Sequence, residues 1–307
     1  MSGAESKAGL SYGPRRLGKS GVLVSPLAWG MWRFRGEDVG TARALVDAAL
    51  ETGINLFDTA DVYGPDNGEA FGASEALLGR VFAEQPSLRD RIVLATKGGI
   101  SLGVPYASSR EDLTRACEAS LKRLQVDRID LYQIHRPDLL AHPAEVAATL
   151  DDLRRAGKIA HAGVSNHTPA QTAALQAHLG FPLASVQPEF SALAIAPLSD
   201  GVLDQAMERD YAVLAWSPLA QGRLADPGGD LRARAVTLEL DRLAAEHGVS
   251  RTAIAYAWIL AHPSGAIPIV GSQQPERIRE AAAALSVRLS KPDWYAVLTA
   301  ARGEPLP

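Results

Sequence analysis

The sequence predicts an α/β fold: a (β/α)8 TIM barrel with an N-terminal β-hairpin and extra C-terminal helices. Eight short apolar segments typical of strands alternate with helix-like segments along most of the 307 residues, and such alternation is typical of parallel sheets. An open nucleotide-binding sheet would place a glycine-rich phosphate turn after its first strand, but this chain has Gly30-Met31-Trp32-Arg33-Phe34 there. A closed barrel, which also accounts for the chain length, is the better interpretation.

The first predicted element is the hairpin. Two short extended pieces flank the polar turn Gly18–Gly21, and glycine in such a turn is a common hairpin signal. Residues 1–14 precede it and are expected to form a flexible N-terminal segment. Residues 15–307 are expected to form a single domain, because the one clear loop, Asp226–Asp230, is weak evidence for a boundary.

Strands are expected where short apolar runs are bounded by turn residues. Functional residues of a (β/α)8 barrel lie at the carboxyl ends of its strands, so these ends are where a site should be sought. The eight predicted strands are Leu27–Trp29, Ile54–Phe57, Ile92–Thr96, Ile129–Ile134, Ala160–Val164, Ala184–Gln187, Ala212–Ala215 and Ile267–Ile269.

Helices are expected where apolar residues recur at a spacing of 3.6. One covers Leu113–Leu124, and Ser109 with Asp112 resembles a capping box at its start. Glycine commonly ends a helix, and two further apolar faces stop at one. The other helical patterns are the face of Val46, Ala49 and Leu50 before Gly53, that of Val146, Leu150 and Leu153 before Gly157, and the stretches Leu238–His247 and Thr252–Ala261.

Composition and charge exclude several classes of protein. Apolar residues make up 47% and charged residues 21%, close to globular averages. The 31 basic and 35 acidic residues give a formal charge of −4, which argues against a general nucleic-acid or membrane-surface binder. One cysteine, Cys117, fits a reducing compartment. With no signal-peptide core and no apolar run of about 20 residues, we expect a cytoplasmic protein without nucleic-acid or membrane partners.

Ionisable side chains end three consecutive predicted strands. Asp58, Lys97 and His135 each share a strand face with apolar residues, because side chains alternate along a strand. A lone Asp, Lys or His at such a place is more often a turn, solvated or structural residue. Three together on the inner face of a barrel are less easily explained in that way, since buried charges are costly unless they pair or do chemistry.

The chemistry of these groups points to carbonyl reduction once Tyr63 is added. A phenol has a pKa of about 10, and a neighbouring ammonium such as that of Lys97 lowers it. Asp58 can pair with the ammonium, and His135 can orient a carbonyl oxygen. The set suits proton donation to an oxygen that gains negative charge. It contains no hydride source, so a cofactor is required.

Ten stretches in a fixed order and spacing, from about residue 15 to 300, match one known family. They are Leu17–Gly21, Trp29–Arg33, Phe57–Gly64, Gly72–Gly79, Thr96-Lys97, Asp130–Asp138, Gly163–Asn166, Gln187, Ala215–Leu219 and Pro268–Ser272. On these stretches the chain resembles the aldo-keto reductase superfamily, and it looks most like the bacterial YdhF-type oxidoreductase branch. The resemblance implies NADPH-dependent reduction of aldehydes or ketones. It also implies that Tyr63 donates the proton, Lys97 tunes Tyr63, Asp58 pairs with Lys97, and His135 orients the carbonyl.

The same resemblance implies a cofactor site. Ser165, Asn166 and Gln187 would bind the carboxamide, and Trp216 would stack on the nicotinamide. Turn formation by Ser165 and Asn166, and a plain core role for Trp216, remain alternatives. The pyrophosphate would lie on Ser217, Leu219, Gly222 and Arg223, and the remaining implied cofactor contacts are Gly30, Trp32, Asp58, Pro218, Gly271 and Gln273.

Arg277 and Ser272 would bind the 2′-phosphate of NADPH, and Glu280 the adenine. An ordinary surface pair of Arg277 with Glu280 or Glu276 is the alternative. Many family members have a basic residue where this chain has Gly271 or Gln273, and Asn where it has Ala281. NADPH is therefore the expected cofactor, and NADH is possible.

The residues expected to line the substrate pocket are Trp32, Phe34, Tyr63, His135 and His167, whereas Trp29 is expected inside the barrel. The expected partner is a small-molecule carbonyl substrate, with no obligate protein partner and no metal. Two other functions remain open: a cofactor-binding redox-sensing or regulatory subunit with little turnover, and a metal-dependent hydrolase or isomerase. The scattered histidines give the latter no ligand spacing.

Overall fold

Eight parallel strands close into a barrel in the computed structural model, which describes residues 12–306. The strands follow chain order, and β10 closes the barrel by pairing with both β3 and β9. No strand end differs by more than two residues from its predicted position, so the predicted barrel is confirmed. The strands are β3 Ala28–Gly30, β4 Leu56–Asp58, β5 Val93–Gly98, β6 Ile129–Ile134, β7 Ile159–Ser165, β8 Ser185–Gln187, β9 Ala212–Ala215 and β10 Ile267–Val270.

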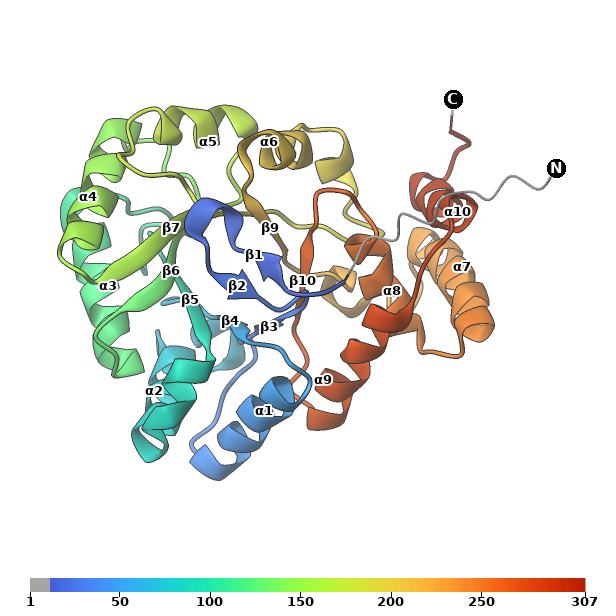
Figure 1. Cartoon of the computed structure of the whole chain (residues 1–307), viewed down its shortest axis with the longest axis horizontal. Helices are drawn as coiled ribbons and strands as arrows, with labels where there is room; N and C mark the ends of the chain where they lie inside the picture. The colour runs from blue at the N-terminus through green and yellow to red at the C-terminus, as the bar shows by residue number, and fades with distance from the viewer. Residues whose placement is uncertain (1–11, 307) are drawn as a thin grey trace.

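Helices surround the barrel (Figure 1). The α-helices are α1 Val39–Glu51, α2 Ala73–Glu84, α3 Arg110–Leu124, α4 Pro143–Arg155, α5 Pro169–Gln176, α6 Val202–Arg209, α7 Leu231–His247, α8 Arg251–Leu260, α9 Pro275–Ala281 and α10 Lys291–Arg302. Short 3-10 helices cover Gly18–Ser20, Pro65–Asn67, Pro86–Arg91, Ala196–Leu198, Ala220–Gly222 and Ala282–Ser286.

Capping groups set the helix ends. The Ser109 side chain accepts a hydrogen bond from the backbone N–H of Asp112 and starts α3 as expected. Helix α7 begins seven residues before the predicted Leu238, because the Asp230 side chain caps it by accepting from the N–H of Ala233. Helices α7 and α10 pack against each other beside the barrel (Figure 1). They account for the expected extra C-terminal helices.

The hairpin covers the N-terminal end of the barrel. Strands β1, Arg15–Arg16, and β2, Leu23–Val24, pair in antiparallel register as predicted. Gly18 between them has a φ of 52°, and a Cβ there would lie 2.5 Å from the carbonyl oxygen of Ala184, just before β8. Only glycine allows this close approach. Of the expected flexible segment 1–14, residues 1–11 lie outside the described residues.

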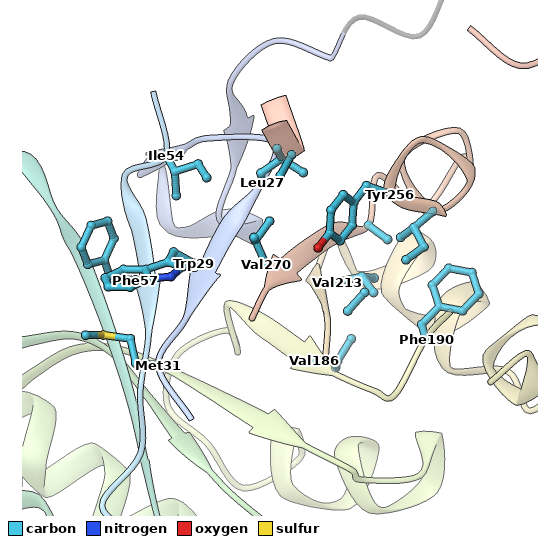
Figure 2. Close-up of a cluster of buried hydrophobic side chains, with 14 of the residues drawn as sticks. Leu27, Trp29, Met31, Ile54, Phe57, Val186, Phe190, Val213, Tyr256 and Val270 are labelled. Carbon is cyan, nitrogen blue, oxygen red and sulfur yellow. The ribbon is translucent and has the colours of Figure 1, made fainter. Parts of the chain in front are cut away.

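Alternation along the strands divides the core into two parts. Small and branched side chains such as Ala28 and Leu56 fill the barrel interior. Trp29 points the other way, so the expectation that it lies inside the barrel is wrong. Its ring packs edge-on against Phe57, with centroids 5.1 Å apart, in the layer between strands and helices (Figure 2). The cause is the alternation of side chains along a strand: Ala28 points into the barrel, so its neighbour Trp29 points outward.

Candidate active site

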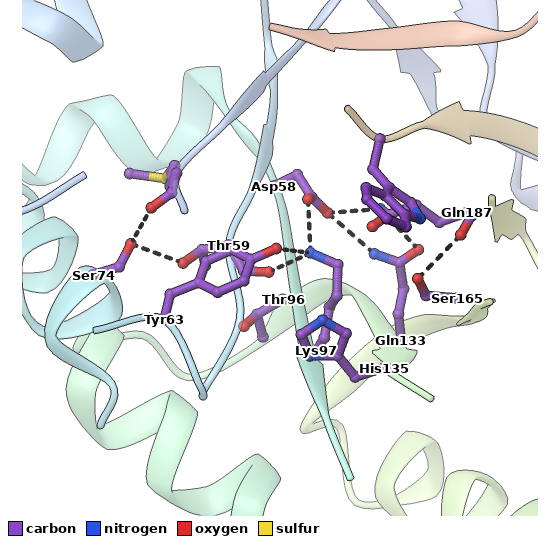
Figure 3. Close-up of polar contacts among 12 residues, drawn as sticks. Asp58, Thr59, Tyr63, Ser74, Thr96, Lys97, Gln133, His135, Ser165 and Gln187 are labelled. Atoms are coloured by element: carbon purple, nitrogen blue, oxygen red, sulfur yellow. Dashed lines mark hydrogen bonds and ion pairs between the residues drawn. The ribbon is translucent and has the colours of Figure 1, made fainter. Parts of the chain in front are cut away.

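Side chains from β4, β5 and the loop after β4 converge at the carboxyl end of the barrel (Figure 3). The Lys97 Nζ atom lies 2.7 Å from Asp58 Oδ2, 3.1 Å from Tyr63 Oη and 2.9 Å from the carbonyl oxygen of Thr59. Asp58 and Lys97 are both buried. The ammonium thus uses its three protons on a carboxylate, a phenol and a backbone oxygen.

Two amides complete the surroundings of the buried carboxylate. Asp58 Oδ1 accepts from Gln133 Nε2 at 3.2 Å and from Gln187 Nε2 at 3.0 Å. The Ser185 hydroxyl donates to Gln133 Oε1 at 3.2 Å and holds that amide in place. Both carboxylate oxygens therefore have partners, which is what a buried charge requires.

His135 stands at the carboxyl end of β6, beside the phenol. Its backbone N–H donates to the carbonyl oxygen of Gly98 at 2.9 Å, and its ring lies edge-on to Tyr63 with centroids 6.0 Å apart. Burial, followed by the positive charges of Lys97 and Arg136, holds the pKa of His135 well below its usual value. The imidazole is consequently neutral at pH 7.

Burial changes the expected effect of Lys97 on Tyr63. Burial is the largest cause and raises the pKa of Tyr63, the charge of Asp58 raises it further, and Lys97 offsets only part of this rise. For Lys97, burial acts to lower the pKa, but Asp58 and Tyr63 outweigh it and the pKa is raised. The phenol therefore keeps its proton at neutral pH, while the amine stays charged.

The loop from Thr59 to Gly64 places Tyr63 over Lys97. The N–H of Thr59 donates to the oxygen of Ala95 at 2.9 Å, and the N–H of Asp61 donates to the oxygen of Lys97 at 3.0 Å. The loop thus continues to pair with β5 after β4 has ended. At Gly64 a Cβ would lie 1.9 Å from the oxygen of Ala70, so this turn needs glycine.

A cavity of 1020 Å³ is lined at one end by Asp58, Tyr63 and His135 and runs toward α8 and α9. Of the residues expected to hold a cofactor, the ones that line this cavity are Gly30, Trp32, Asp58, Ser165, Asn166, Gln187, Trp216, Ser217, Pro218, Leu219, Gly222, Gly271, Ser272, Arg277 and Glu280. Two expected residues are absent from its lining. Arg223 instead pairs with Asp230 at 3.1 Å, and Gln273 donates to the oxygen of Gly30 at 3.0 Å.

Ser165, Asn166 and Trp216 form one hydrogen-bonded group in the cavity wall. Asn166 has a φ of 59°, a left-handed conformation that asparagine tolerates. Its Oδ1 accepts from Trp216 Nε1 at 3.0 Å, and its Nδ2 donates to Ser165 Oγ at 2.9 Å and to the oxygen of His135 at 3.2 Å. Asn166 is thus both a turn residue and the group that fixes the indole ring at the cavity.

The far end of the cavity contains an unpaired cation. Among residues 12–306, Arg277 has no carboxylate within 4.0 Å, so the alternative surface pair with Glu276 or Glu280 is not formed. Glu280 instead accepts from the Thr252 hydroxyl at 3.5 Å. The sequence analysis missed several lining residues here, among them Asp241, Arg251, Thr252 and Tyr256. These four belong to α7 and α8, so a search for polar residues at the carboxyl ends of strands does not find them.

At the substrate end, Trp32, Tyr63 and His135 line the cavity as expected, but Phe34 and His167 do not. Phe34 is buried against the ring of Trp29, with centroids 5.4 Å apart. His167 Nδ1 is 2.9 Å from the oxygen of Ser165. Both follow strands in sequence, but the loops turn their rings away from the cavity.

Two arginines at this end were also missed. Arg136 lies 6.0 Å from the centre of the Trp216 ring, and Arg33 lies 4.8 Å from that of Trp32. Both line the cavity. Their positions next to His135 and Trp32 in the sequence could have indicated that they also line the cavity.

Residues 12–306 contain neither a metal-binding cluster nor a membrane-spanning helix. No three His, Cys, Asp or Glu side chains there are grouped so as to hold a metal ion. No helix in the same part of the chain is long and apolar enough to cross a membrane.

Comparison with known proteins gives a consistent family. The aldo/keto reductase family model matches residues 26–301. A 6-dehydroglucose reductase of Novosphingobium aromaticivorans is 55% identical over 295 residues, covering 95% of this chain and 97% of the relative. The oxidoreductase YdhF of Escherichia coli is 35% identical, with 94% and 97% covered. A thermostable aldo-keto reductase crystallised with the inhibitor epalrestat has a TM-score of 0.80 at 25% identity, with 94% and 99% covered.

Proposed function

Because the chain belongs to the aldo/keto reductase family and is an NAD(P)H-dependent oxidoreductase, we propose that it reduces the carbonyl group of an aldehyde or ketone, with NADPH as hydride donor and Tyr63 as proton donor. The observation that carries this proposal is the contact of Lys97 Nζ with both Asp58 and Tyr63, at 2.7 and 3.1 Å. This arrangement places a protonated phenol beside a fixed positive charge at the floor of a large cavity.

Each of the four groups has a distinct task in this proposal. A substrate carbonyl oxygen between Tyr63 and His135 accepts hydrogen bonds from the phenol and the neutral imidazole. When bound, NADPH supplies a hydride to the carbonyl carbon, so the C=O π electrons move to the oxygen. Tyr63 gives its proton to that oxygen, and Lys97 stabilises the phenolate that remains. Asp58 keeps Lys97 charged and in place.

The cavity is suited to a dinucleotide. Its 1020 Å³ is at the upper end of the range of ligand sites, about 300–1,000 Å³. Trp216 presents a ring fixed by Asn166 near the tetrad of Asp58, Tyr63, Lys97 and His135, and Arg277 stands without a carboxylate partner at the other end. A guanidinium without a counter-ion suits a phosphate, which favours NADPH over NADH.

The substrate class that we propose is an aldehyde on a polyhydroxylated chain, such as a sugar. Two relatives, 55% and 36% identical, are named 6-dehydroglucose reductase. The substrate end of the cavity combines the ring of Trp32 with the charged side chains of Arg33, Asp66 and Arg136. Such groups provide several donors and acceptors for hydroxyl groups, together with an aromatic face for C–H groups.

The test is NADPH oxidation with 6-dehydroglucose and with an activated aromatic aldehyde, using the wild type and Tyr63→Phe. The variant should lose kcat by about 10²- to 10⁴-fold, the usual worth of a positioned acid, while its NADPH affinity stays within about threefold. Tyr211→Phe is a matched control, since within residues 12–306 that hydroxyl forms one hydrogen bond, to Gln176 Oε1 at 3.4 Å. A Tyr63→Phe enzyme that turns over at the wild-type rate would refute the proton-donor role.

A further inference from the structure

Asp61 is a buried carboxyl group without a hydrogen-bond partner. Its side chain is 1% exposed, and neither oxygen forms a hydrogen bond with any of residues 12–306. An ionised carboxylate in such a place would lack both water and a donor, at a cost of several kcal/mol. This residue lies two positions before Tyr63, and the proposed mechanism gives it no role.

The neighbouring charges do not supply a partner. Glu75 is also buried. Its Oε2 accepts a hydrogen bond from Arg123 Nε at 2.7 Å, and its Oε1 accepts one from the Thr96 hydroxyl at 2.5 Å. The Arg123 guanidinium therefore already pairs with Glu75, and the Lys97 ammonium already pairs with Asp58 and hydrogen-bonds to Tyr63. Within residues 12–306, Asp61 lies beside two ion pairs, and neither of their cations is free to balance a charge on Asp61.

The groups that face Asp61 come from four elements. Burial raises the pKa of Asp61 well above its usual value, and the charge of Glu75 on α2 raises it further. Arg123 on α3, the N–H of Val62, which is near but does not meet hydrogen-bond geometry, and Lys97 on β5 act in the opposite direction but more weakly. Tyr132 on β6 is also buried and carries no charge, since its own pKa is raised well above the usual value.

The position of Asp61 links it to the reacting phenol. Its N–H donates to the oxygen of Lys97 at 3.0 Å, so its backbone is part of the contact that fastens the Tyr63 loop to β5. A negative charge on its side chain would act on Tyr63 in the same direction as Asp58, by raising the pKa of the phenol and weakening it as an acid.

We propose that Asp61 is a positioning residue that works as an uncharged carboxylic acid: its burial holds the Tyr63 loop on β5, and its bound proton keeps a second carboxylate from acting on the phenol. This inference rests on the proposed function, because it assumes that Tyr63 is the proton donor. It predicts that the shape of the Asp61 side chain is needed to hold the Tyr63 loop on β5, and that a negative charge on it would weaken Tyr63 as an acid.

Asp61→Asn tests this directly, because asparagine has the same shape and cannot ionise. The full-length variant should keep kcat within about threefold of the wild type at pH 6. The ratio of its kcat to that of the wild type should rise as the pH is raised to 9, because only the wild type acquires the extra charge. Asp90→Asn, at an exposed residue, is the control and should give a flat ratio.

Thermal unfolding supplies a readout that does not depend on activity. A carboxyl group whose pKa is raised by folding contributes stability that is fully present below its unfolded pKa of about 3.9 and is lost as the pH rises through its folded pKa. The Tm of Asp61→Asn minus that of the wild type should therefore increase from pH 5 to pH 9, and the Asp90→Asn difference should not.

Three results would overturn the inference: an Asn variant that does not fold, a Tm difference that is independent of pH, or a loss of more than about 100-fold in kcat at pH 6 with NADPH affinity intact. The last would show that the carboxylate takes part in the chemistry. Failure of the proposed function has a different signature, because Tyr63→Phe would then keep its rate while the Tm differences still report the proton on Asp61.

Discussion

Replacing Lys97 by methionine should destabilise the protein as well as stop the reaction. Methionine matches the length of the lysine stem, so the change removes mainly the charge. It leaves Asp58 buried, with the amides of Gln133 and Gln187 on Oδ1 and no partner on Oδ2. Breaking one side of a buried ion pair costs about 3–5 kcal/mol, because the remaining charge is uncompensated.

The size of the effect on Tm follows from the chain length. Unfolding entropy is about 2.1 cal/mol/K per residue, which for 307 residues amounts to roughly 0.6 kcal/mol/K. A loss of 3–5 kcal/mol then lowers Tm by about 5–8 °C. The double variant Lys97→Met with Asp58→Asn should recover most of this loss, since no buried charge remains, yet stay inactive.

The assay is thermal unfolding of the wild type, both single variants and the double variant at pH 7, read by calorimetry beside NADPH oxidation rates. The cycle isolates the coupling between the two side chains. If Lys97→Met melts at the wild-type temperature, or if the double variant is no more stable than Lys97→Met, then Asp58 is not held as a buried charge and the assignment of its role fails.

Two predictions concern the ends of the cavity. Arg277→Ala should raise the KM for NADPH by about 10- to 150-fold, the worth of one charge-assisted hydrogen bond of 1.5–3 kcal/mol, and leave that for NADH nearly unchanged. Equal effects on both cofactors would remove Arg277 from the 2′-phosphate site. Arg136→Met should raise the KM for 6-dehydroglucose by about tenfold with a smaller change in kcat. Arg223→Met, outside the cavity, is its control, and a similar rise in KM there would count against a specific contact.

The sequence predicted the parts of the molecule that a repeating pattern determines. Alternation along strands placed Asp58 and Lys97 on inward faces, and hydrogen-bonded pairing of neighbouring strands brought their ends together. The expectation that Trp29 lies inside the barrel was wrong, because alternation gives the inward position to its neighbour Ala28. A narrow interior accepts the smaller Ala28, and the larger ring goes to the outer layer.

Loop side chains were less predictable, because no period governs their directions. Phe34 and His167 follow strands as lining residues do, yet one packs on Trp29 and the other turns back to the oxygen of Ser165. Arg251 reaches the cavity from the start of α8, where it pairs with Asp241 at 2.6 Å. Its place depends on how α7 and α8 pack on the barrel, and sequence spacing does not encode this.

The N-terminal hairpin has a consequence for the supply of protons. Leu17 and Val24 are fully buried at the closed end of the barrel, in contact with the apolar side chains that fill its interior. Water therefore has no route to the tetrad along the barrel axis from that end. Under the proposed mechanism, every proton that Tyr63 gives away must be restored from the cavity side, which is also the exit for the alcohol. Reprotonation of the enzyme and departure of its product thus share one passage, and an obstruction at the mouth would delay both.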